Sequence, residues 1–243
     1  MNRAYWQTSR APRYSLLFAL PLLILYQTLA ATVPAGPAGG VRNGADVLLR
    51  QLFTTIAGLH GPLVFMICLI AAGLWLVAKD IRARGERLSP MVFAAMLGES
   101  VGLALACGIV VGGLTAALLG TPPPLASPAG ARLGSATVLM LSLGAGIYEE
   151  LLFRVLLVGL LAWVARRVFG APPLVAGAAA TLGGALVFAA FHYIGPFGDP
   201  LDLYSFVFRT IAGLFFSALY LLRGFGITAW THALYDVFLL LRP

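Results

Sequence analysis

Charged residues are scarce in this sequence, and their scarcity excludes most soluble proteins. Only 10% of the 243 residues are Asp, Glu, Lys or Arg, and 60% are hydrophobic. An average soluble domain carries about 25% charged residues. The mean hydropathy of +0.93 points the same way. We therefore expect an all-α polytopic membrane protein, whose apolar surface faces lipid.

Cysteine is also rare. Cys68 and Cys107 both fall in apolar stretches, so we expect two buried thiols and no disulfide framework. A clear signal-peptide cleavage site is missing behind the first apolar stretch, where residues 30–35 are a weak candidate only. We accordingly expect no removable signal peptide.

Seven apolar segments are long enough to cross a bilayer as helices. They cover residues 14–33, 63–78, 91–119, 136–165, 174–192, 203–222 and 225–241. A further stretch, 45–59, has apolar residues near helical spacing, and we expect it to lie in the membrane interface. We interpret residues 1–243 as one integral membrane domain, a helical bundle of about seven transmembrane helices, with six to eight allowed.

The net charge of +7 predicts the orientation of the bundle. In a membrane protein, basic loops mark the cytoplasmic side and attract anionic lipid, so we expect membrane lipid as a partner and no nucleic acid. A cytoplasmic N-terminus places ten basic residues inside: Arg3, Arg10, Arg13, Lys79, Arg82, Arg84, Arg87, Arg166, Arg167 and Arg223. Four then lie outside: Arg42, Arg50, Arg132 and Arg242. The Ala-, Gly- and Leu-rich composition is typical of bacteria, so we expect the bacterial inner (cytoplasmic) membrane.

One charged motif interrupts the fourth apolar segment, at Tyr148-Glu149-Glu150-Leu151-Leu152-Phe153-Arg154. A charge at the centre of a membrane helix costs about 2.5–3.5 kcal/mol on insertion scales, so such residues are usually paired and functional. Glu150 and Arg154 are four residues apart and share a helix face, which predicts an ion pair that acts as a structural clamp. Glu149 lies about 100° round the helix and is left for chemistry. The alternative is a cytoplasmic helix end with solvated charges.

Two later segments carry polar groups as well. His192 ends the fifth, and the seventh contains His232 and Asp236, four residues apart on one face. Helix packing can bring such groups together in a bundle core, as in other helical catalytic and metal sites. Alternatively, His192 is an interfacial side chain, and His232 and Asp236 form a polar pair between helices.

Two smaller expectations concern other parts of the bundle. Glu99 is a second candidate for a buried carboxylate, and we expect it to pair with Arg209 across helices. In the long fourth segment, Gly144 and Gly146 are candidate bend points.

These residue types suffice for amide hydrolysis. A desolvated glutamate can act as general base on water, a histidine can hold that water, and further polar groups can donate hydrogen bonds to an oxyanion. Glu149, His192 and His232 are alternatively zinc ligands, with water at the open position.

The three motifs resemble the CPBP family of intramembrane proteases, the CAAX prenyl protease and bacteriocin-processing type. They are Glu-Glu-x-x-x-Arg at 149–154, Phe-x-x-x-His at 188–192 and His-x-x-x-Asp at 232–236. The resemblance covers about residues 136–241, which would form the protease core, while the earlier part adds membrane helices.

The resemblance implies a role for each motif residue. Glu149 would activate water with His192 as its partner, and His232 with Asp236 would form the oxyanion side. Glu150, Arg154 and Phe188 would support the site. Prenyl-protein-processing relatives have asparagine at the last position. An ionised aspartate cannot donate a hydrogen bond, so Asp236 alternatively orients His232.

We therefore expect an intramembrane endopeptidase acting on a membrane-anchored protein or peptide. We favour a metal-independent mechanism, because the sequence has no Cys ligand set or paired-His zinc helix motif; zinc is the alternative cofactor. Two other functions remain open. One is a transporter or proton-coupled carrier with a relay of Glu99, Glu149, Arg209 and the histidines. The other is a non-catalytic membrane scaffold of the same fold.

His60 gives a first prediction. It stands beside Gly61-Pro62 with no other polar residue clustered near it in the sequence, so we expect a loop histidine without a functional role. Activity and thermal unfolding of His60→Ala should match those of the wild-type protein. A large loss of activity would place His60 in the site.

Overall fold

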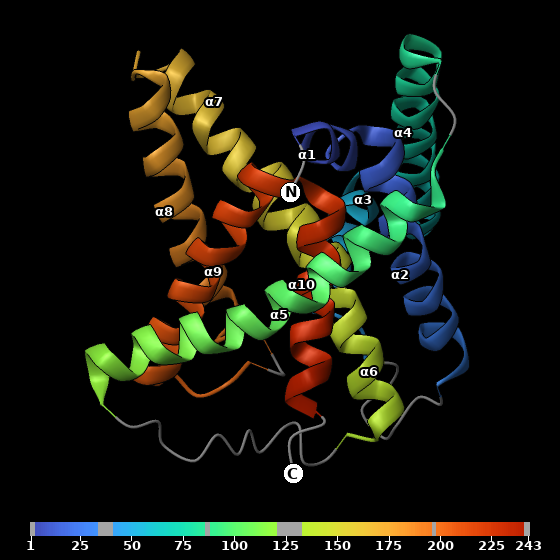
Figure 1. Ribbon diagram of the computed structural model, residues 1–243. Coiled ribbons are helices and arrows are strands. Elements are labelled where there is room, and N and C mark those ends of the chain that lie inside the picture. Colours follow the sequence, from blue (N-terminus) through green and yellow to red (C-terminus); the bar gives the residue numbers. More distant parts are fainter. Residues whose placement is uncertain (1–2, 34–40, 86–87, 121–132, 196–197, 241–243) are drawn as a thin grey trace.

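The computed structural model describes residues 3–33, 41–85, 88–120, 133–195 and 198–240, and these contain helices and no strand (Figure 1). The all-helical class expected from composition is therefore confirmed. The helices are α1 (Arg3–Ser9), α2 (Pro12–Thr32), α3 (Gly44–Ala57), α4 (Gly61–Arg84), α5 (Pro90–Leu119), α6 (Ser135–Gly144), α7 (Gly159–Arg167), α8 (Pro173–Phe191), α9 (Leu203–Arg223) and α10 (Phe225–Leu240). The described residues also contain a 3-10 turn, η1 (Gly58–His60), and a π-helical segment of 14 residues, η3 (Ala145–Val158).

Among the described residues, five stretches are long and apolar enough to cross a membrane, which makes the chain a polytopic membrane protein. They are Pro12–Thr32, Gly44–Arg84, Pro90–Leu119, Pro173–Phe191 and Leu203–Arg223. Each of these stretches either contains one of the predicted spans or agrees with its bounds to within two residues. The other two predicted spans are helical too: 136–165 becomes α6, η3 and α7 in succession, and 225–241 becomes α10, with 16 residues. The number of complete crossings and the orientation stay predictions, and Arg87, Arg132 and Arg242 lie outside the described residues.

The stretch expected at the interface forms a helical hairpin. Asn43 caps α3 by accepting a hydrogen bond from the backbone N of Ala45 at 2.9 Å. The turn η1 then reverses the chain, and α4 packs back on α3. A Cβ at Gly61 would overlap the backbone of Thr54, so this tight return needs glycine. His60 lies exposed in the turn, as predicted.

The helix that carries the charged motif widens where a bend was expected. It changes from α to π geometry at Ala145 and returns to α at Gly159. A Cβ at Gly144 would lie 2.6 Å from the ring of Tyr26, and one at Gly146 would overlap the carbonyl oxygen of Ala229. The two glycines thus permit close contact with α2 and α10, and the predicted bend is instead a widened turn. Such π turns are frequent at functional sites.

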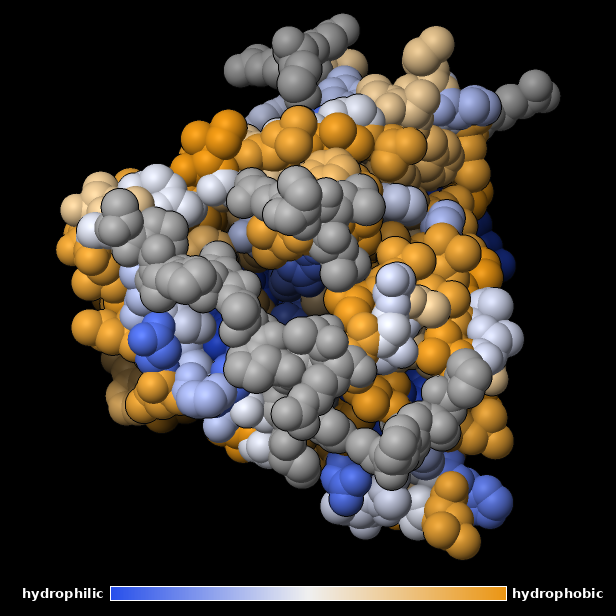
Figure 2. All heavy atoms as spheres, turned by 90° about the horizontal axis from the view of Figure 1, so that it is seen from below, coloured by the Kyte–Doolittle hydropathy of each residue, from blue (hydrophilic) through white to orange (hydrophobic). Residues whose placement is uncertain are grey.

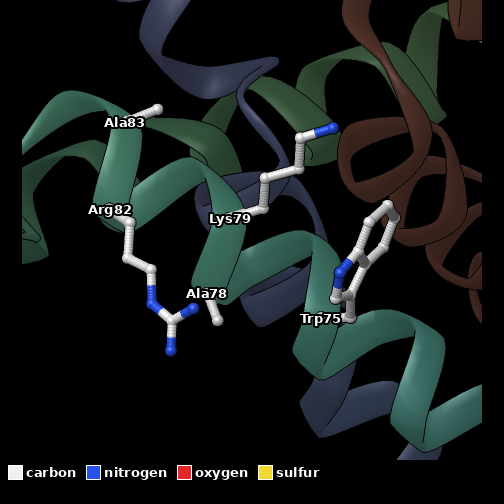
Figure 3. A pocket seen from close by; sticks show the side chains of 5 residues that line it. All are labelled: Trp75, Ala78, Lys79, Arg82 and Ala83. Atoms are coloured by element: carbon white, nitrogen blue, oxygen red, sulfur yellow. The ribbon is translucent and has the colours of Figure 1, made fainter.

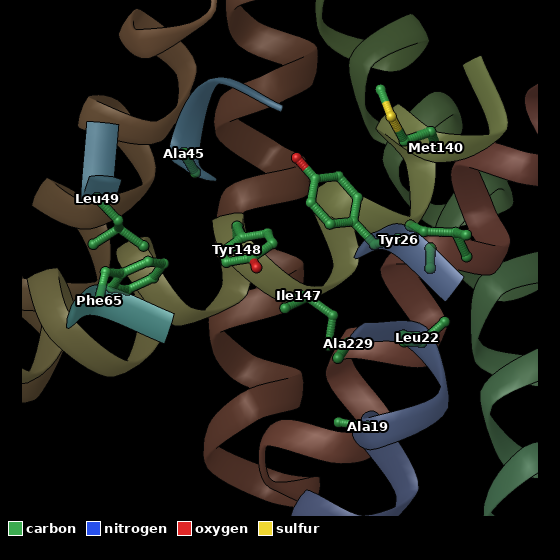
Figure 4. Close-up of a cluster of buried hydrophobic side chains, with 12 residues drawn as sticks. Ala19, Leu22, Tyr26, Ala45, Leu49, Phe65, Met140, Ile147, Tyr148 and Ala229 are labelled. Carbon is green, nitrogen blue, oxygen red and sulfur yellow. The ribbon is translucent and has the colours of Figure 1, made fainter. Parts of the chain in front are cut away.

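The largest buried cluster joins the two halves of the chain around η3 (Figure 4). The rings of Tyr26 and Tyr148 meet edge to face with centroids 5.1 Å apart. Because lipid is as apolar as these side chains, van der Waals packing stabilises such a cluster more than the hydrophobic effect does. Its members are Ala19, Leu22, Tyr26, Ala45, Leu49, Phe65, Met140, Leu143, Ile147, Tyr148, Ala229 and Ala233.

The outer faces of α4 and α7 each carry a shallow hollow. The one on α4 is lined by Trp75, Ala78, Lys79, Arg82 and Ala83 (Figure 3), and the one on α7 by Gly159, Ala162, Trp163, Arg166 and Arg167. Tryptophan beside basic residues is typical of a membrane–water interface, which fits the ends of these helices.

The two cysteines differ in burial. Cys107 is buried in α5, as expected, but Cys68 is exposed on α4. The expectation for Cys68 was wrong because its face of α4 is not covered by another helix.

Glu99 pairs with Arg223, not with Arg209. Its Oε1 lies 2.5 Å from Arg223 Nε and its Oε2 lies 2.8 Å from Arg223 Nη2. Tyr5 also donates to Oε2, at 2.7 Å. Arg209 pairs instead with Asp199. Arg223 is the last residue of α9, whereas Arg209 lies in its second turn, about 21 Å away along the helix axis, and Glu99 of α5 meets the later residue.

A double-mutant cycle tests this pairing. Glu99→Gln and Arg223→Gln should each lower the free energy of unfolding, and the cycle should give a coupling of about 1–3 kcal/mol, because the pair is bidentate and largely buried. Glu99→Gln with Arg209→Gln serves as the control pair and should show no coupling in thermal unfolding. Coupling in the control alone would restore the original expectation.

Candidate active site

Glu150 is the most enclosed group of the charged motif, with a side chain that is fully buried in η3. Its Oε2 lies 3.2 Å from Arg154 Nε, so the predicted ion pair is present. Its Oε1 lies 2.7 Å from Nδ1 of His232 on α10. Glu150 therefore connects two helices, a second role that helical spacing alone did not indicate.

Aromatic rings surround the partner cation. The guanidinium carbon of Arg154 lies 4.4 Å from the ring centroid of Phe188 and 5.7 Å from that of Phe216. A cation over an aromatic face gains about 2 kcal/mol or more when it is removed from water. Phe188, expected to support the site, thus contacts the buried arginine directly.

The neighbouring carboxylate, Glu149, is arranged differently. Its Oε1 accepts a hydrogen bond from Asn43 Nδ2 at 2.8 Å, and its Oε2 lies 4.0 Å from Nε2 of His192. Nδ1 of His192 lies 2.8 Å from the carbonyl oxygen of Phe188. Because a carbonyl only accepts, Nδ1 carries the proton, and the lone pair of Nε2 faces Glu149 in the neutral ring.

His232 and Asp236 complete the group. Nε2 of His232 lies 3.8 Å from Asp236 Oδ2, and its ring stacks on Phe216 with centroids 4.3 Å apart. The sequence left open that Asp236 orients His232. In the structure, the close hydrogen bond of His232 is the one from its other ring nitrogen, Nδ1, to the carboxylate of Glu150.

The site is enclosed on one side and open on the other. Side-chain exposure is 0% at Glu150 and 10% at Glu149, but 26% at His192 and 28% at Asp236. Figure 1 shows α6 beginning and α10 ending at the lower side of the molecule. Seen from that side, hydrophilic atoms are visible at the floor of a central hollow, with hydrophobic residues along part of its border (Figure 2). Water and substrate groups can therefore reach the open side while the clamp stays dry.

The structure brings all four residues proposed from the motifs, Glu149, His192, His232 and Asp236, into one group. Sequence reasoning missed Asn43, which lies just before the stretch 45–59 that was expected at the membrane interface. A signal for it was present: Asn43-Gly-Ala-Asp46 before an apolar run is a helix N-cap pattern. That pattern predicts the cap but not the contact with Glu149.

Two of the alternatives can be compared with this geometry. In the described part of the chain, no group of three or more His, Cys, Asp or Glu side chains is arranged to hold a metal ion. His232 Nδ1 is held by Glu150, which leaves Nε2 as the nitrogen that could ligate a metal, so the zinc set of Glu149, His192 and His232 stays an alternative. The transporter relay loses two members, because Glu99 and Arg209 are held by other partners.

The clamp gives a stability prediction. Glu150→Ala should lower the free energy of unfolding by about 3–5 kcal/mol, because it leaves the buried Arg154 without its counter-ion. Activity should fall as well, since His232 loses its hydrogen bond. Thermal unfolding and abundance in the membrane measure the effect, with His60→Ala as the neutral control. Wild-type stability of Glu150→Ala would contradict the clamp.

Comparison with known proteins places these residues in a family. Residues 132–238 match the family model described as Type II CAAX prenyl endopeptidase Rce1-like. No curated protein and no solved structure matches the chain. The match contains all three motifs, whereas Asn43 lies outside it. Residues 132–238 thus form a domain of the Rce1-like type II CAAX prenyl endopeptidase family, within the CPBP proteins.

Proposed function

We propose that the protein is an intramembrane endopeptidase in which Glu149 and His192 activate a water molecule. The observation that supports this proposal most directly is the distance of 4.0 Å between Glu149 Oε2 and His192 Nε2. This is too long for a direct hydrogen bond, and both atoms are acceptors. A bridging water can donate one hydrogen to each, which orients its oxygen lone pairs toward a substrate carbonyl.

The reaction then follows general base catalysis. The water oxygen attacks the carbonyl carbon of the scissile peptide bond, and Glu149 takes the proton that the water loses. Glu149 next returns this proton to the leaving amide nitrogen as the C–N bond breaks, which yields a carboxylic acid and an amine. A positioned base of this kind contributes about 10²–10⁴-fold to the rate.

His232 is placed to stabilise the oxyanion. Its Nδ1 proton faces Glu150, so Nε2 can donate only when the ring is an imidazolium. The carboxylates of Glu150 and Asp236, at 2.7 and 3.8 Å, balance the charge of such a ring. In this arrangement Asp236 acts on His232 and not on the oxyanion itself.

The substrate we propose is a membrane-anchored protein or peptide, because the site lies among helices that are apolar enough to sit in lipid. The mechanism is metal-independent in this proposal. The cellular location we propose is the bacterial inner membrane, with a cytoplasmic N-terminus.

The test is cleavage of a membrane-anchored peptide library by the purified protein in detergent, with and without a strong chelator. Glu149→Gln keeps the size of the side chain and removes the base, so kcat should fall by at least about 10²-fold. Cleavage by the wild-type protein should survive chelation.

Glu99→Gln is the matched control, because it neutralises another carboxylate of an apolar helix that lies outside the site. Its kcat per folded molecule should equal that of the wild-type protein. Retained activity in Glu149→Gln would refute the proposal. Activity that is lost on chelation and restored by zinc would instead favour the metalloprotease.

A further inference from the structure

The two oxygens of Glu149 have different surroundings, and the difference originates outside the family-matched segment. Oε2 faces His192 across 4.0 Å, whereas Oε1 is bound by the side-chain amide of Asn43 at 2.8 Å. Asn43 is buried, at 5% exposure, and stands at the start of α3. One oxygen is thus occupied, and the other is left toward the open side.

Asn43 can present only its amino group to Glu149. Its Oδ1 already accepts the hydrogen bond from Ala45 N that caps α3. The amide nitrogen is therefore the end that faces the carboxylate, where it donates. One side chain both begins a helix and binds the acid of the charged motif.

A buried polar network holds Asn43 itself. Its backbone N donates to the hydroxyl of Tyr26 at 3.2 Å, and that hydroxyl donates to Asp46 Oδ2 at 2.8 Å. Asp46 is held in turn by Arg42 at 3.0 Å and Arg50 at 2.6 Å. The asparagine is therefore fixed by several groups of α2 and α3 before it meets Glu149.

The motif helix is pressed against this network. A Cβ at Gly144 would lie 2.7 Å from Cβ of Asn43. Only glycine at this position, directly before η3, therefore lets the motif helix approach Asn43 so closely. The hydroxyl of Tyr148 accepts a hydrogen bond from Gln27 Nε2 at 2.5 Å. Neighbouring residues Tyr148 and Glu149 are thus both anchored by side chains from the first half of the chain.

We infer that Asn43 is a positioning residue for catalysis: it holds Glu149 Oε1 so that Oε2 alone faces the water and His192. The inference rests on the proposed function of Glu149. A carboxylate without this donor can rotate about its last side-chain bond and lose its alignment with His192. The first half of the chain therefore contributes a part of the active site.

Asn43→Asp separates positioning from capping. Aspartate still accepts from Ala45 N and caps the helix, but it offers no donor to Glu149. We expect kcat to fall about 10- to 100-fold, as when supporting groups of other sites are removed, while KM changes less than about twofold. The melting temperature is measured alongside, because aspartate also adds a buried charge beside Glu149.

Asp202→Asn is the matched control. Asp202 caps α9 by accepting from Ser205 N at 2.8 Å, and it is exposed, whereas Asn43 is buried. This control makes the reverse exchange, aspartate to asparagine, at a helix cap that does not bind Glu149. We therefore expect kcat to stay unchanged. Asn43→Ser is the second variant, because serine also caps a helix but adds no charge beside Glu149. It should lose kcat to a similar extent.

The measurements are kcat and KM on the library peptide that the wild-type protein cleaves best, and thermal unfolding of each variant. Glu149→Gln and the double variant that combines Asn43→Asp with Glu149→Gln are measured alongside. The double variant should be no slower than Glu149→Gln alone, because Asn43 acts through Glu149. Wild-type kcat in Asn43→Asp and Asn43→Ser, with Glu149→Gln inactive, would overturn the inference and leave the proposed function standing.

Loss of kcat in proportion to lost stability in both variants would also overturn the inference, because Asn43 would then be purely structural. An active Glu149→Gln would refute the proposed function instead.

Discussion

A carboxylate without access to water, Glu150, is the constraint on which the site depends. A charge buried this deeply must be paired, since removal of one partner costs about 3–5 kcal/mol. Its Oε2 forms an ion pair with Arg154 on the same helix, and its Oε1 accepts a hydrogen bond from His232 on α10. The position of His232, the contact between η3 and α10, and the aromatic rings around Arg154 follow from meeting this requirement.

Two adjacent glutamates thus acquire opposite properties from their surroundings. Glu150 is fully buried, ion-paired with Arg154 and hydrogen-bonded to His232, and it connects η3 with α10. Glu149 has one oxygen bound by Asn43 and one directed toward His192. Paired carboxylates in other enzymes divide their work in the same way, through environment and not through residue type.

Local patterns in the sequence predicted more than long-range ones. Composition gave the class, and hydropathy located α5, α8, α9 and α10 to within a few residues. Spacing of four predicted the Glu150–Arg154 pair, because both residues belong to one helix. The predicted partner of Glu99 was wrong, and the sequence did not predict the contacts Asn43–Glu149 and Glu150–His232. Each joins helices whose relative rotation and height depend on packing, and no residue spacing within one helix encodes these.

The mixed core around Tyr26 and Tyr148 bears on where this family's functional unit begins. Six of its twelve side chains precede residue 132, the start of the family match. A fragment restricted to residues 132–238 would expose half of that interior to lipid or detergent. The segment that family comparison detects is therefore smaller than the unit that folds. In this chain, replacement of the amino-terminal half would also replace the polar network that holds Glu149 from behind η3.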